Sequence, residues 1–221
     1  MNTLIDHDTL GLRTTSAVLD SRIQEPDDRL LSILEASKFI LPTENAWVGG
    51  PVARNTPVPC WNDLIALGAQ IFWVETEKSQ NEIVKCADIE IPGCQMARRR
   101  YRPLRARSMS FSAAATWLCA VSMDVADDRE EEFNDWYSEE HVPRIATVPG
   151  VVSAGRFIAI EGYPRYLALY YVEGPATLMS PEYAQATETP WTRRVRRFMR
   201  SVSRYVYRHS SLMRRGGPGS S

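Results

Sequence analysis

The 221-residue sequence has few of the residues that mark metal-binding and disulfide-stabilised folds. It contains only three histidines and four cysteines. The cysteines form no CxxC pair, and no histidine accompanies them at zinc-ligand spacing. We therefore expect neither a disulfide framework nor a metal site. The thiols are expected to be buried; they belong to Cys60, Cys86, Cys94 and Cys119.

Other common catalytic signatures are also missing. The chain has no glycine-rich phosphate loop, no G-x-S-x-G sequence and no H-E-x-x-H sequence. These absences argue against nucleotide binding, α/β-hydrolase chemistry and zinc-protease chemistry.

Long apolar runs are absent too. No run is long enough to cross a bilayer, and the start of the chain, MNTLIDHDTLGLRTT, has neither a basic region nor an apolar core of the secretory kind. We expect a cytoplasmic protein without a membrane partner.

The charges are separated along the chain although the formal net charge is only -1. Residues 127–140 are dominated by Asp and Glu, whereas residues 193–215 contain nine arginines and no acid. A basic segment can contact nucleic acid, but the near-neutral total argues against it. We expect these arginines to pair with acids of the same chain or of a partner subunit.

The second half of the sequence alternates strand and helix patterns. Strands are predicted at Thr116–Val125, Val151–Ile160, Arg165–Glu173 and Ser201–His209, with one helix running from Asp127 through His141 and a second beginning at Pro175. The resulting order, βαββαβ, predicts an α+β, ferredoxin-like unit.

The first half repeats this order in degraded form, at an offset of about one hundred residues. Its strands are predicted at Thr15–Ile23, Ala69–Glu75 and Ala97–Leu104, its helix at Pro26–Ser37, and a turn at Asn45, Gly49 and Gly50. The predicted organisation is an extension (1–13), a degenerate unit (14–106), a linker (107–115), a second unit that carries the site (116–210) and a disordered tail (211–221).

Three pieces of the second half carry a family resemblance. They are EEEFNDWYSEEHVPRIATVPGVVSAGRF, PRYLALYYVEGPATLMSPEYAQA and PWTRRVRRFMRSVSRYVYR. They resemble the dimeric α/β-barrel superfamily and, within it, EthD-like proteins and related uncharacterised families. The first half lacks an E-H-x-P counterpart.

The resemblance implies a four-stranded antiparallel sheet with two helices on one face, and two such units that join into a barrel. Both units come from one chain as an internal pseudo-dimer, or two chains form a homodimer. Some members of the superfamily are enzymes that act on small aromatic, polyketide-like or lactone substrates without metal or organic cofactor. Others bind haem, and many have no assigned activity.

The first helix places several chemically useful side chains on one stripe. With a rotation of 100° per residue about the helix axis, this stripe contains Phe133, Trp136, Tyr137, Glu140 and Arg144, and His141 lies at its edge. We interpret Phe133 and Trp136 first as core anchors. The hydroxyl of Tyr137 needs a partner when buried and is available for a ligand.

His141 is the main candidate for acid–base chemistry because it is the only histidine outside the terminal segments and titrates near neutrality. Pro143 cannot donate a helical hydrogen bond, so the helix is expected to loosen or end near His141 and turn the imidazole toward a cavity. Glu139 or Glu140 would then fix the tautomer of the imidazole. The structural alternative is a histidine that caps the helix C-terminus.

Further candidates lie outside this helix. Arg156 either faces the barrel interior, where it would hold a carboxylate or enolate oxygen, or forms an ion pair at the rim. Tyr166 and Tyr170 share one face of their strand while Tyr171 points the other way. Trp191 either covers a pocket mouth or packs in the core.

The leading hypothesis is a cofactor-independent enzyme with a pocket inside the barrel of the second unit. His141, Tyr137 and Arg156 would be catalytic in proton transfer next to a carbonyl, giving cyclisation, isomerisation, elimination or carbon–carbon cleavage of a small aromatic or carbonyl compound. Substrate-binding residues would be Trp136, Glu140, Arg144, Tyr166, Tyr170 and Trp191.

Three alternatives stay open from the sequence. One is a cofactor-free oxygenase that acts on an aromatic substrate. Another is a non-catalytic carrier of a small ligand or an assembly subunit. The last is a haem protein, with the peripheral His7 or His209 as a possible ligand.

Overall fold

The computed structural model describes residues 12–19, 46–53, 58, 70–76, 94–104 and 115–209. The first half contributes β1 (Leu12–Leu19), β2 (Ala46–Pro51), β3 (Gln70–Thr76) and β4 (Cys94–Pro103). The predicted helix at 26–37 and the tail from 211 lie outside the described residues, as do Cys60 and Cys86 and most of the predicted linker.

The second half follows the predicted strand order closely. Its strands are β5 (Trp117–Val125), β6 (Val151–Ala159), β7 (Tyr166–Val172) and β8 (Met199–His209). Its first helical segment consists of the 3₁₀ turn η4 (Asp127–Arg129), α4 (Glu130–Asp135), the π-helix η5 (Trp136–His141) and α5 (Val142–Ile145). The second consists of the 3₁₀ turn η6 (Thr177–Met179), α6 (Pro181–Thr187) and α7 (Pro190–Val195).

The second helical segment differs from the prediction, which placed its start at Pro175. The regular helix α6 begins at Pro181, because the Ser180 side chain caps it by accepting from the Tyr183 amide at 3.1 Å. A separate helix, α7, follows with Thr189 as its cap. The sequence signal was the repeated pattern of a hydroxyl residue directly before a proline.

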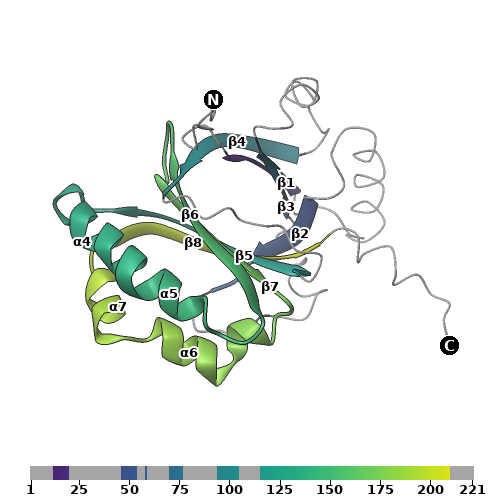
Figure 1. Ribbon diagram of the computed structural model, residues 1–221. Helices are drawn as coiled ribbons and strands as arrows, with labels where there is room; N and C mark the ends of the chain where they lie inside the picture. Colours follow the sequence, from purple (N-terminus) through teal and green to yellow (C-terminus); the bar gives the residue numbers. More distant parts are fainter. Residues whose placement is uncertain are drawn as a thin grey trace, which may run out of the picture.

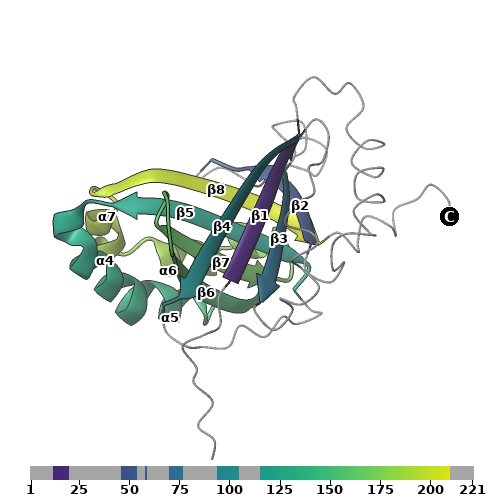
Figure 2. The ribbon, with the colours of Figure 1, turned by 90° about the horizontal axis from the view of Figure 1, so that it is seen from above.

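The described strands form a closed antiparallel barrel in the order β1, β3, β2, β8, β5, β7, β6, β4 (Figures 1 and 2). Within each half the order is the same: the fourth strand pairs with the first, the first with the third and the third with the second. The two halves meet along β2 with β8 and along β4 with β6. The fold is therefore α+β and ferredoxin-like.

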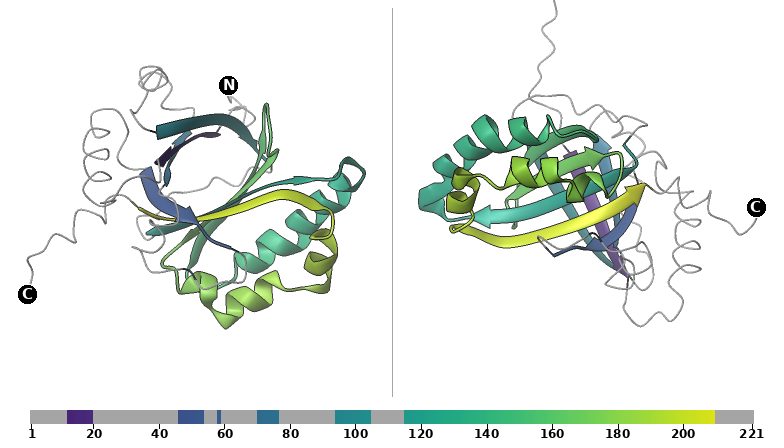
Figure 3. Two further views of the ribbon diagram at one scale, coloured as in Figure 1. Left: turned by 180° about the vertical axis from the view of Figure 1, so that it is seen from behind. Right: turned by 90° about the horizontal axis from the view of Figure 1, so that it is seen from below.

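Helices α4 to α7 cover the outer face of the second-half sheet (Figure 3). Because side chains alternate along a strand, each strand supplies both a helix-facing layer and a barrel-facing layer. On β7, Tyr166, Ala168 and Tyr170 belong to the helix-facing cluster, whereas Leu167, Leu169 and Tyr171 belong to the barrel-facing one. The buried Cys119 thiol lies in the helix-facing cluster, as predicted for this cysteine.

The predicted turn at Gly49 and Gly50 is wrong, since both glycines lie within β2 and pair with β8. Two adjacent glycines are typical of turns, but here they permit close approach of two backbones. A Cβ atom added at Gly49 would lie 1.9 Å from the carbonyl oxygen of Val206. The seam between the two halves therefore requires glycine at this position.

We expect Gly49→Ala to lower the free energy of unfolding by about 2–4 kcal/mol, because either β2 or β8 must shift away from the added methyl group. Gly174→Ala is the matched control, since nothing lies within 4 Å of a Cβ at that position. Its effect is expected to stay within about 0.5 kcal/mol. Urea unfolding of both variants measures the difference, and equal stability would show that β2 does not approach β8 this closely.

Candidate functional site

The described part of the chain contains a pocket of about 540 Å³ between the helices and the second-half sheet. This pocket lies on the helix-covered face of the sheet, whereas the sequence-based expectation placed the substrate pocket inside the barrel. Most first-half side chains of the barrel lie outside the described residues, so a pocket in the interior stays a prediction. The barrel-facing side of the same strands carries the packed side chains Leu118, Leu169, Tyr171 and Tyr207 together with Trp47. Lining residues of the pocket are Val121, Trp136, Tyr137, His141, Tyr170, Leu178, Met179, Ser180, Tyr183, Ala184, Thr187, Glu188, Arg196, Met199, Val202 and Arg204.

One wall of the pocket is the π-helix η5, which directly precedes Pro143. In an α-helix the residue at position 143 would donate to the carbonyl of Glu139, which proline cannot do. The backbone widens instead, and the Val142 amide donates to the Tyr137 carbonyl, five residues back. The predicted loosening near His141 is confirmed, but the helix continues to Ile145. Single π turns of this kind are frequent at functional sites.

The widened turn brings His141 against three aromatic rings. Its imidazole stacks on Trp136, with ring centroids 4.2 Å apart and an angle of 30° between planes. Tyr137 meets it edge-on at 5.1 Å, and Tyr170 at 6.4 Å. The side chain is only 9% exposed and lines the pocket. A titratable imidazole thus lies at an aromatic wall with little access to bulk water.

A chain of polar contacts fixes the Trp136 ring. Its indole nitrogen donates to the Thr192 hydroxyl at 3.1 Å, and that hydroxyl lies 2.9 Å from the Thr189 hydroxyl. Thr189 in turn donates to the Glu140 carboxylate at 2.5 Å. Because each hydroxyl has one proton, Thr192 is assigned as donor to Thr189. Glu140 was expected to orient His141 directly; its hydrogen bond to Thr189 instead supports the ring on which His141 stacks.

Arg156 differs from both expectations, since it faces neither the barrel interior nor the rim. Its guanidinium is buried beneath the Tyr137 ring, 4.0 Å from the centroid, and donates to the Asn134 side chain at 2.8 Å. Tyr137 lines the pocket, whereas Arg156 is not among the lining residues. A cation behind an aromatic ring stabilises that ring's position, so Arg156 is placed to support Tyr137 and not to touch a ligand.

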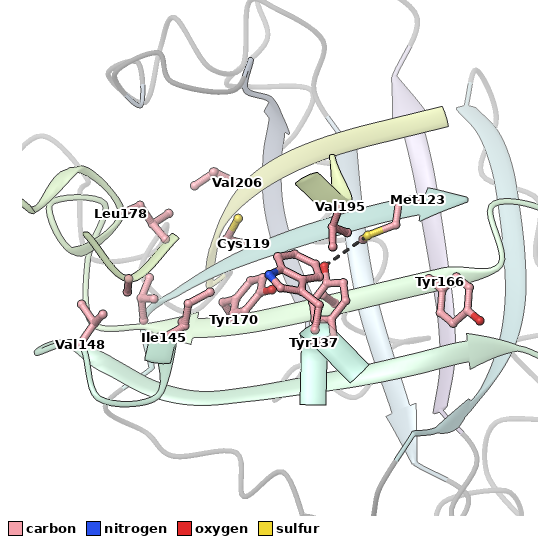
Figure 4. Close-up of a cluster of buried hydrophobic side chains, with 14 of the residues drawn as sticks. Cys119, Met123, Tyr137, Ile145, Val148, Tyr166, Tyr170, Leu178, Val195 and Val206 are labelled. Carbon is pink, nitrogen blue, oxygen red and sulfur yellow. Dashed lines mark hydrogen bonds between the residues drawn. The ribbon is translucent and has the colours of Figure 1, made fainter. Parts of the chain in front are cut away.

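Among the helix-facing tyrosines, Tyr137 and Tyr170 lie close together and Tyr166 lies apart from them (Figure 4). The Tyr137 hydroxyl donates to the Met123 sulfur at 3.2 Å. Tyr170 lines the pocket, and burial, together with neighbouring Tyr137, raises the pKa of its hydroxyl well above the usual value. Tyr166 lies farther along β7, where its hydroxyl donates to the Glu130 carboxylate. Of the pair that share this face, Tyr170 alone is among the lining residues.

Two other predicted binding residues have structural contacts. Arg144 is exposed and donates to the carbonyl oxygens of Gln185 and Ala186 at 3.2 and 3.4 Å, which ties α5 to α6. Trp191 is partly buried against the helix-facing core. The structure therefore brings together His141, Tyr137, Trp136 and Tyr170 at the pocket, and it leaves Arg144, Arg156, Glu140, Tyr166 and Trp191 outside its lining.

Several lining residues of the pocket were not predicted from the sequence. Arg204 on β8 and Tyr183 on α6 both line the pocket, as do Arg196 and Glu188. Arg196 and Glu188 form an ion pair at 2.7 Å, which agrees with the expected pairing of this arginine-rich segment. The signal for Arg204 was available: it shares strand parity with Val202 and Val206, so a cation stands on the side that faces the helices.

Within the described ranges, no group of three or more His, Cys, Asp or Glu side chains is arranged to hold a metal ion. None of the helices described is both long and apolar enough to span a bilayer.

The sequence matches no family model, and no curated protein is similar to it by sequence. Solved structures do share its fold. An anthrone oxidase-like protein superposes with a TM-score of 0.56 at 12% identity, covering 91% of this chain and 92% of its own. A candidate monooxygenase from Fusobacterium nucleatum superposes with a TM-score of 0.54 at 7% identity, covering 90% of this chain and 92% of its own. A chlorite dismutase from Candidatus Nitrospira defluvii superposes with a TM-score of 0.53 at 8% identity, covering 93% of this chain and 95% of its own. The chain thus shares a ferredoxin-like fold with these proteins.

Proposed function

We propose that this chain is a cofactor-independent oxygenase that acts on a small, electron-rich aromatic compound in the pocket beside η5. The observation that carries this proposal is the position of His141, stacked on Trp136 and bordered by Tyr137 and Tyr170 at the pocket wall. Aromatic walls favour a flat aromatic ligand, and an imidazole is a side chain that can serve as a general base.

The chemistry begins with proton transfer. His141 accepts a proton from an activated CH₂ group of the substrate and leaves a carbanion delocalised over the aromatic system. The carbanion passes one electron to dioxygen, and the resulting radical and superoxide combine to a peroxide that takes the proton back from His141. Loss of water then gives the ketone. The balance is R₂CH₂ + O₂ → R₂C=O + H₂O, with dioxygen as the oxidant.

Two features of the fold support this choice over the other hypotheses. The anthrone oxidase-like protein and the candidate monooxygenase share the architecture, which is support at the level of fold only. The arrangement around His141 also keeps the imidazole largely shielded from water, a condition that protects a carbanion from reprotonation.

The direct test is oxygen consumption by the purified protein with anthrone as substrate. The expected result is one dioxygen consumed for each ketone formed, without added metal, flavin or nicotinamide. Turnover that requires a haem with a visible Soret band would overturn the cofactor-independent proposal. Product formed without oxygen uptake would favour the second candidate, in which His141 transfers protons in an isomerisation or elimination, and tight binding without turnover would indicate a ligand carrier.

We further propose that the two halves arose by tandem duplication and act as an internal pseudo-dimer. The identical strand order of the two halves supports this, as does the closure of the barrel by strands of one chain. An EthD-like relationship of the second unit, suggested by its E-H-x-P and V-P-G sequences, remains a proposal as well.

A further inference from the structure

Arg204 is a cation in the pocket for which the described structure supplies no anion. It lies on β8 opposite Val121 of β5, and its side chain is partly buried. None of the ion pairs found among the described residues includes it. Arg196, in the same pocket, contrasts with it because both oxygens of Glu188 are bound to its guanidinium.

Among the described residues, the groups that act electrostatically on Arg204 are the Cys119 thiol and the hydroxyls of Tyr183 and Tyr170, and none of them is a carboxylate. Burial raises the pKa of the Cys119 thiol, and the opposing effect of Arg204 is smaller. Burial also raises the pKa of Tyr170. A guanidinium in such surroundings has lost part of its hydration without gaining a carboxylate.

Arg204 on β8 and the aromatic residues of η5 line the same pocket, which suits a ligand with two distinct ends. The rings of Trp136, Tyr137 and Tyr170 form an aromatic wall, while Arg204 brings a planar donor fork from β8. Guanidinium groups bind carboxylate and similar oxygen pairs in this way.

We infer that the ligand of this pocket is a flat aromatic anion whose carboxylate or enolate oxygens are bound by Arg204. This inference deepens the proposed function by naming the charge of the substrate, and it rests on the same pocket. Arg204 is then a substrate-binding residue that selects acids over neutral aromatics of equal size.

Calorimetric titration with 2-naphthoate and its neutral isostere 2-naphthamide tests the inference without any turnover. The wild-type chain is expected to bind naphthoate at least about 10-fold more tightly than the amide. Arg204→Met, which keeps the length of the side chain, should weaken naphthoate binding by about 30-fold or more and leave amide binding within about 3-fold. Arg204→Lys should give an intermediate loss because the charge remains but the fork does not.

Arg200→Met is the matched control, since Arg200 lies on the same strand, is exposed and does not line the pocket. It should bind both probes as the wild type does. Equal affinity of the wild type for acid and amide, or no binding of either, would overturn the inference even if the Arg204 variants fail to fold. Binding of naphthoate by a protein that does not oxidise anthrone would contradict the proposed oxygenase and keep the anion site. Oxidation of anthrone that is unaffected by Arg204→Met, by a protein that does not prefer naphthoate to the amide, would do the reverse.

Discussion

Replacing His141 with Gln is expected to lower oxygen-dependent turnover by about 10²- to 10⁴-fold, which is the usual contribution of a positioned general base. Glutamine retains a polar side chain of similar length but cannot accept the proton whose removal starts the reaction. The imidazole stacks on Trp136, so the substitution also removes one aromatic contact and can lower stability. The melting temperature is therefore measured together with the rate, to separate a loss of catalysis from a loss of folding.

His209→Gln provides the matched control for this substitution. His209 ends β8 and packs edge-on against Trp47, with centroids 4.8 Å apart, so it lies outside the pocket lining. Its replacement should leave turnover within about 2-fold while costing a comparable aromatic contact. A His141→Gln protein that is folded and fully active would remove His141 from the mechanism.

Steep loss of stability above pH 10 is the second large expected effect. Burial raises the pKa values of Tyr170, Tyr171 and Tyr207. For such a tyrosine the pKa is higher in the folded state than in the unfolded state. Its contribution to the free energy of unfolding is fully present below the unfolded-state pKa, near pH 10, and is lost as the pH rises above that value. Each such tyrosine removes about 1.4 kcal/mol per pH unit, and the three together remove about 4 kcal/mol per pH unit.

The contribution of one tyrosine can be isolated by measuring the free energy of unfolding between pH 10 and 11. Tyr170→Phe should reduce the loss over this pH unit by about 1 kcal/mol, whatever its effect at neutral pH, because the unfolded-state hydroxyl is between half and fully ionised in this range. Tyr163→Phe is the control, since Tyr163 is 72% exposed and should leave the slope unchanged. An unchanged slope in Tyr170→Phe would mean that this hydroxyl ionises as readily in the folded protein as in the unfolded one.

The strand order of the second half could be predicted because its signals are local. Alternating side chains and the Gly162–Pro164 turn mark β6 and β7, and the apolar run before Asp127 marks β5. Pro143 likewise predicts a disturbed helix at His141, since its missing N–H acts within one turn. The strand formed around Gly49 could not be predicted in this way, because its reason is the close approach of β8 from the other half of the chain.

Residue type, periodicity and proline geometry act over a few residues. The candidate reactive groups of the second unit and the order of its strands could therefore be predicted from the sequence alone. Three relations could be found only in the folded protein: the pocket on the helix-covered face, the contact of Arg156 with the Tyr137 ring, and the presence of Arg204 and His141 in one lining. These relations join residues from different strands and helices. They depend on packing between elements far apart in the chain, which no local pattern contains.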